Sequence, residues 1–132
     1  MQPQASLALE IIDSRQDRFC VVLQNLIEFW SVATRPVEAN GLGFSQSEAE
    51  DEIQNIESVF TLLPESPDIA KVWRRLIHAH PTSSKNVHDA RLVASMLVHK
   101  VTHLLTFNSS DFVRYSEIKV FEPRQLIDAA NI

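Results

Sequence analysis

The 132-residue sequence has little of what marks secreted and membrane-spanning proteins. It contains a single cysteine, which excludes an internal disulfide. Cys20 lies in the apolar run Phe19–Leu23, so we expect a buried, reduced thiol. No apolar run approaches the ~20 residues of a membrane span. The first five residues lack the basic and apolar segments of a signal peptide. We therefore expect a cytoplasmic protein with no membrane association.

Glycine is also scarce, and its distribution excludes some active sites. The two glycines lie together in Asn40–Gly43, which makes this segment the clearest predicted loop and leaves no glycine-rich phosphate loop. No serine lies in a nucleophile-elbow pattern. These absences argue against nucleotide binding through such a loop and against acyl transfer.

Charge is divided unevenly along the chain, although the net charge is only −5. Residues 1–70 have a balance of −9, whereas residues 71–132 have a balance of +4 and contain all five histidines. A basic half can guide a polyanion towards a site. Two solvent-exposed faces of different charge, with no role in binding, would explain the same division. Charge alone does not decide between these two interpretations.

Length and composition indicate one globular domain over residues 1–132, with 45% hydrophobic residues. Ser45–Glu48 forms a capping box, and Ser66-Pro67-Asp68 is a second helix start. Periodicity predicts helices over residues 7–18, 26–33, 45–60, 66–77, 89–99 and 124–130, and strands over residues 19–23, 62–63, 103–107 and 118–121. This alternation indicates an α/β fold with a parallel sheet covered on both faces. The chain nevertheless opens with a helix, whereas a crossover unit should open with a strand.

Three acids follow the predicted strands in a way that indicates a shared site. Asp89 lies in the first turn of its helix, Asp111 lies in a polar loop after the strand at 103–107, and Glu28 lies in an otherwise apolar segment. The helix dipole explains Asp89 alone, and turn formation explains Asp111 alone. Glu28 has the weakest structural explanation, because a partly buried acid needs a partner. At the carboxyl edge of a sheet the three predict a site for Mg²⁺ or Mn²⁺. Thr106 and Asn108 would orient water or a phosphate from behind the ligands.

Histidine pairs offer an alternative metal site. His78 and His80 are two residues apart, and His99 and His103 are four apart, a spacing that suits zinc on one helix face. Val101 and Thr102, however, indicate that a helix ends between the last pair. No His-Glu-x-x-His pattern is present, so we favour surface histidines.

Several segments together resemble the PIN-domain family, best known as the ribonuclease toxins of VapBC-type toxin–antitoxin pairs. The matching segments are residues 24–30, 33–36, 40–43, 87–94, 105–108, 111–112 and 118–120, with Pro123. The resemblance implies a Rossmann-like parallel sheet flanked by helices, and an acidic cluster that holds Mg²⁺ or Mn²⁺. It makes Glu28, Asp89 and Asp111 the second, third and fourth members of that cluster.

The sequence departs from the family at its N-terminus. PIN domains open with a strand that ends in the first and most important acid, and that strand lies in the middle of the sheet. Here the chain starts where the first helix of the family starts, and Asp13 and Asp17 fall along the predicted helix. The missing strand would leave two inner strands with unpaired backbone groups. We expect a misassigned start or an N-terminally truncated gene, ahead of a gap filled by a partner or a repacked sheet.

The resemblance implies a metal-dependent endoribonuclease of toxin type, with activity weakened by the loss of one of four carboxylates. RNA, a small antitoxin and a second copy in a homodimer are the implied partners. The alternative is a non-catalytic PIN-like module, or a degenerate remnant, that binds an antitoxin or itself. Phe29, Trp30 and Trp73 would then line a groove, although core packing explains them better.

Overall fold

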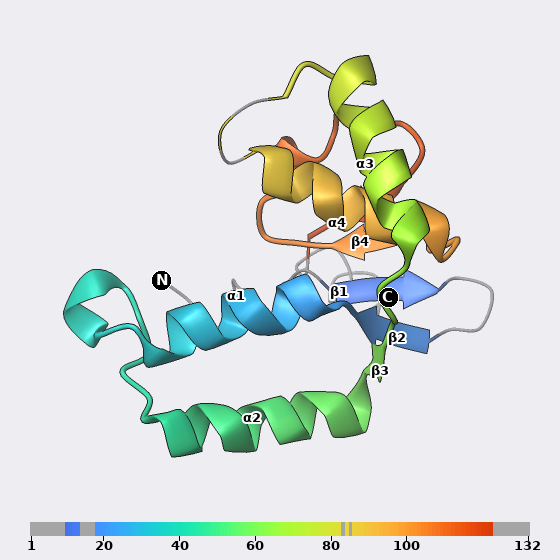
Figure 1. The fold of residues 1–132 in the computed structure, drawn as a ribbon. Helices are drawn as coiled ribbons and strands as arrows, with labels where there is room; N and C mark the ends of the chain where they lie inside the picture. The colour runs from blue at the N-terminus through green and yellow to red at the C-terminus, as the bar shows by residue number, and fades with distance from the viewer. Residues whose placement is uncertain (1–9, 14–17, 83, 85, 123–132) are drawn as a thin grey trace, which may run out of the picture.

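The computed structural model describes residues 10–13, 18–82, 84 and 86–122 (Figure 1). The elements are β1 (Glu10–Asp13), β2 (Arg18–Val21), α1 (Leu23–Thr34), the 3₁₀ helix η2 (Val37–Ala39), α2 (Gln46–Val59), β3 (Thr61–Leu62), α3 (Pro67–Ala79), α4 (Asn86–Val98), β4 (His103–Leu105), the 3₁₀ helix η3 (Ser109–Asp111) and β5 (Lys119–Phe121). This alternation confirms the predicted α/β fold class. The helix predicted over residues 124–130 lies outside the described residues.

The strands form one mixed sheet in the order β3-β2-β1-β4-β5. β2 pairs with β3 in parallel, and β4 pairs with β5 in parallel. β1 lies between these two pairs and runs antiparallel to both neighbours. Its residue Ile11 is opposite Cys20 on one side and Leu104 on the other. The predicted parallel pairs are therefore present, but an antiparallel strand joins them.

The helix predicted over residues 7–18 is wrong for residues 10–13, which form β1; residues 7–9 and 14–17 lie outside the described part. A short apolar run such as Ile11–Ile12 suits either a helix or a strand. The inner edges of β2 and β4 would otherwise present unpaired N–H and C=O groups, and β1 pairs with both. The gap expected in the middle of the sheet is filled by a strand of the chain itself.

Local sequence signals set the starts of α2 and α3 as predicted. At α2 the Ser45 amide donates to the Glu48 carboxylate over 2.9 Å, and the Glu48 amide donates to the Ser45 hydroxyl over 3.1 Å. At α3 the Asp68 amide donates to the Ser66 hydroxyl over 3.2 Å, with Pro67 in the first helical position. α4 begins at Asn86, earlier than the predicted start at Asp89.

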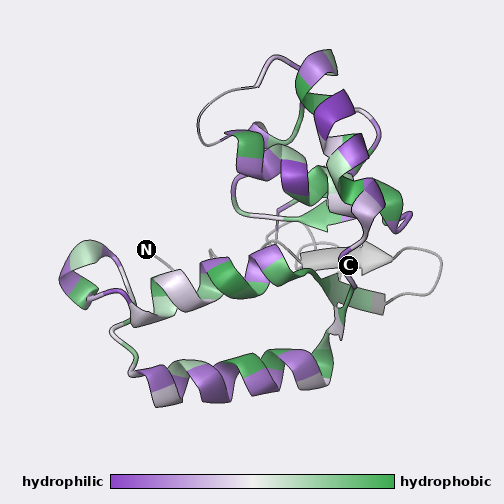
Figure 2. Cartoon of the chain, viewed as in Figure 1, coloured by the Kyte–Doolittle hydropathy of each residue, from purple (hydrophilic) through white to green (hydrophobic). Residues whose placement is uncertain are grey.

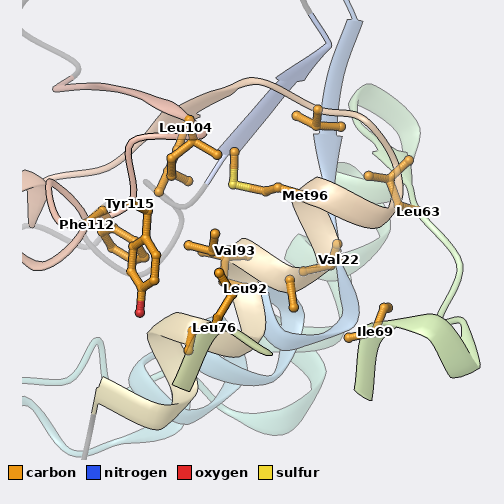
Figure 3. Packing of buried hydrophobic residues seen from close by; sticks show 14 of the residues in the cluster. Val22, Leu63, Ile69, Leu76, Leu92, Val93, Met96, Leu104, Phe112 and Tyr115 are labelled. Carbon is orange, nitrogen blue, oxygen red and sulfur yellow. The ribbon is translucent and has the colours of Figure 1, made fainter. Parts of the chain in front are cut away.

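The helices pack in two pairs, α1 beside α2 and α3 beside α4, and each pair has its own buried cluster (Figure 1). The larger core joins α3, α4, β4 and the segment after η3, and its side chains include Leu76, Leu92 and Tyr115 (Figure 3). The smaller core joins β2, α1 and α2. Figure 2 shows hydrophobic and hydrophilic residues on the same helices, as expected when one face of a helix is buried. Cys20 is fully buried, as predicted.

Candidate functional site

Two hollows meet at the N-terminal part of α4, where His88 and Arg91 line both of them. One hollow, of about 480 Å³, lies against α1 and is also lined by Gln24, Ile27, Glu28 and Ser31; we call it the Glu28 hollow. The other, of about 410 Å³, lies against α3 and includes Ile69, Ala70, Trp73 and Val87; we call it the Trp73 hollow. Both volumes fall within the ~300–1,000 Å³ of small-ligand sites.

Arg91 ties the walls of these hollows together. Its guanidinium donates to the Gln24 side-chain oxygen of α1 over 3.2 Å and pairs with Glu65, which precedes α3, over 2.5 Å. The Gln24 amide in turn donates to the His88 carbonyl over 2.9 Å and to the Glu28 carboxylate over 3.2 Å. A continuous polar chain therefore runs from Glu65 to Glu28 through Arg91 and Gln24.

Glu28 is partly buried in α1, as the apolar sequence around it predicted. Its carboxylate accepts a hydrogen bond from the Gln24 side-chain amide. Burial raises the pKa of the Glu28 carboxyl above its ordinary value, and the hydrogen bond from Gln24 and the charge of His88 oppose the rise. Because burial is the largest effect, the site holds this carboxyl less readily ionised than a surface acid.

Asp89 lies in the first turn of α4, as predicted, and is partly buried. It does not line the Glu28 hollow. Its carboxylate instead acts on the hydroxyl of Tyr115: burial raises the pKa of Tyr115, and the negative charge of Asp89 adds to that rise. The side chain of Tyr115 is almost fully buried in the larger core. Asp89 therefore lies close enough to Tyr115 for its charge to act on that hydroxyl.

Asp111 and its two predicted helpers follow β4. Asp111 ends the short helix η3, and its amide donates to the Asn108 carbonyl over 3.0 Å. Thr106 is fully buried, and its hydroxyl accepts the Asn108 amide over 3.0 Å. These two hydrogen bonds shape the turn, and the Thr106 amide donates to the Phe121 carbonyl of β5 over 2.9 Å. They support the turn explanation of this loop and leave the predicted ligand role of Asp111 as a prediction.

The predicted acids do not come together as a metal centre among the described residues. Within that part of the chain, no three Asp, Glu, His or Cys side chains are grouped so that they could hold a metal ion. Asp13 is the last residue of β1, and the helix predicted for it is wrong. Its backbone is opposite that of Arg18, at the start of β2. Since β1 runs antiparallel, its end lies away from the edge where β2 and β4 end. The ligand roles of Glu28, Asp89 and Asp111 therefore stay predictions.

Sequence reasoning did not single out Gln24, His88 or Arg91, which shape both hollows. One signal was available: Gln24 lies four residues before Glu28, and His88 three before Arg91, so each pair shares one helix face. Nothing local indicates that Arg91 meets Gln24 and Glu65, which are distant in the sequence.

No helix in the described part of the chain is long and apolar enough to cross a membrane.

Comparison with known proteins gives one clear result: the family model for the PIN domain matches residues 1–118. No curated protein and no solved structure gives a significant match. The match covers most of the sequence and includes Glu28, Asp89 and Asp111, together with the elements that carry them. The chain therefore belongs to the PIN-domain family, whose members are generally nucleases that use divalent metal ions.

Proposed function

We propose that this protein is an RNA-directed PIN domain of the ribonuclease-toxin type, and that the 132-residue chain cleaves RNA weakly or not at all. The family match carries the proposal. It is supported by the charge of the second half of the chain, where Lys71, Arg74 and Arg75 are exposed on α3. Exposed cations of this kind neutralise phosphates of a nucleic acid.

The expected weak activity rests on the set of acids. Among the described residues, no group of three Asp, Glu, His or Cys side chains that could hold a metal ion is found. A carboxyl with a raised pKa also binds a metal ion less readily, because a proton competes with the ion. We therefore assign no catalytic step to Mg²⁺ or Mn²⁺ in this arrangement. Glu28, Asp89 and Asp111 remain the side chains on which we expect any metal-dependent cleavage to depend.

Restoring a first strand that ends in Asp tests this proposal. Such a strand would run parallel between β2 and β4, so it must displace the antiparallel β1. Short single-stranded RNA would be incubated with each version and Mg²⁺ or Mn²⁺. We expect cleavage by the extended version, its loss in that version with Asp89→Asn, and little cleavage by the 132-residue chain. Equal, Asp89-dependent cleavage by both versions would refute the proposal that the 132-residue chain cleaves RNA weakly or not at all.

A second candidate function rests on the lack of a metal-binding group of three side chains among the described residues. A PIN domain without an assembled acidic cluster suits a non-catalytic module that binds a small antitoxin or a second copy of itself. If the extended version binds Mn²⁺ in calorimetry but neither version cleaves RNA, this second function is favoured. Light scattering at several concentrations tests the predicted homodimer separately.

A further inference from the structure

We propose that the Trp73 hollow binds the base of an unpaired nucleotide in a single-stranded RNA. This inference rests on the proposed function, because it names how the same site selects its RNA. The hollow adjoins the Glu28 hollow across the shared side chains His88 and Arg91. A base in the first hollow would therefore direct the neighbouring phosphate towards the second, where Glu28 lies.

The lining of the Trp73 hollow suits a flat, apolar group. Trp73 is partly buried against the larger core, and its indole N–H already donates to the Val87 carbonyl over 2.9 Å. The indole donor is thus used, and the ring offers the hollow an apolar surface held in place. Ile69 and Ala70 add further apolar surface. Stacking on an aromatic side chain is how proteins bind unpaired bases of any sequence.

The charges around the hollow suit a phosphate chain. Among the described residues, Glu65 is the one acid that lines it, and that carboxylate is paired with Arg91 over 2.5 Å. Arg74 is exposed on α3 one turn after Ala70, and Lys71 and Arg75 are exposed beside it. An apolar hollow bordered by cations matches a nucleotide, with its flat base and charged phosphate. A neutral or basic peptide side chain would gain nothing from the positive charge of Arg74 and Arg75.

Tryptophan fluorescence provides a direct test. The chain has two tryptophans, so Trp30→Phe leaves Trp73 as the single reporter. Trp30 packs against the smaller core and is not among the described residues that line either hollow. Titration with short single-stranded RNA in EDTA prevents cleavage and measures binding alone. We expect saturable quenching of Trp73 by the single strand and much weaker quenching by the duplex formed with its complement.

Substitution of Ala70 tests the site without disturbing the core. Ala70 is exposed and lines the hollow, so Ala70→Glu places a negative charge there, and Ala70→Gln adds similar bulk without charge. Ala79→Glu adds the same charge at the exposed far end of α3, outside the hollow. We expect Ala70→Glu to weaken binding of single-stranded RNA about tenfold, as loss of one stacked base would. Ala70→Gln should weaken it less, and Ala79→Glu should change it less than about twofold at physiological salt.

The outcomes separate this inference from the proposed function. RNA binding with silent Trp73 fluorescence, or with equal affinity in Ala70→Glu and Ala79→Glu, overturns the nucleotide site and leaves the hollow to a protein ligand. Failure to bind any RNA in EDTA overturns the RNA-directed function as well. If the protein binds single-stranded RNA, Ala70→Glu weakens that binding, and no metal-dependent cleavage is seen, the nucleotide site is supported. That result counts only against catalysis.

Discussion

Replacing Arg91 with methionine removes the guanidinium that joins α1 to the segment before α3, and it keeps much of the apolar stem. Two interactions are lost, and they differ in exposure. The Glu65 partner is exposed: the side chains of Arg91 and Glu65 are 36% and 42% exposed. The Gln24 partner is buried, with 7% of its surface exposed. The consequences for stability should therefore differ as well.

The magnitude follows from that difference. A solvent-exposed ion pair contributes ~0–1 kcal/mol, so loss of the Glu65 contact costs little. A buried polar atom left without its partner costs ~1–3 kcal/mol, and the Gln24 side-chain oxygen loses the Arg91 donor. We therefore expect Arg91→Met to lower the free energy of unfolding by about 2 kcal/mol, most of it through Gln24. Glu65→Gln should lower it by less than about 1 kcal/mol.

Urea unfolding followed by circular dichroism measures these values, provided that the slope of the transition is unchanged. A double-mutant cycle with Gln24→Met should show a coupling of about 1 kcal/mol between Arg91 and Gln24, because the two side chains touch. Arg75→Met, on the exposed face of α3, is the matched control and should stay within about 0.5 kcal/mol of the parent. The reasoning is wrong if Glu65→Gln destabilises as much as Arg91→Met, since the exposed pair would then carry the network.

Two further predictions concern a pKa and a helix cap. The raised pKa of Glu28 means that the folded state binds its proton more tightly than the unfolded state, so its contribution to stability is fully present below pH 4.5 and declines as pH rises through the folded pKa. The Glu28→Gln side chain cannot ionise. The free energy of unfolding of this variant, relative to that of the parent, should therefore increase between acidic pH and pH 7. A difference that does not depend on pH would contradict the burial argument. Ser45→Ala removes the hydroxyl that caps α2 and should lower the unfolding free energy by about 1 kcal/mol, whereas Ser47→Ala in the same turn should change it little. Thermal unfolding of both serine variants checks this, and equal losses would argue against the cap.

The sequence predicted those parts of the fold that depend on neighbours along the chain. The capping box at Ser45–Glu48 and the start of α3 at Pro67 involve residues within one helical turn, so their residue types determine the outcome. The apolar run at Phe19 predicted β2, because a continuous apolar segment suits a strand buried in a sheet. The partial burial of Glu28 was also visible in the sequence, in the apolar residues around it.

Tertiary structure alone decided three other features. Residues 10–13 form a strand because the facing edges of β2 and β4 need partners, and an isolated Ile-Ile pair carries no such information. The antiparallel direction of β1 then decides that Asp13 lies away from the edge where β2 and β4 end. Arg91 finds Gln24 and Glu65 only when α1, α3 and α4 pack together. The sequence by itself thus determined the starts of α2 and α3, the strand β2 and the family, since these rest on local pattern. The middle of the sheet and the paired hollows depend on contacts between distant residues, which only the folded chain brings together.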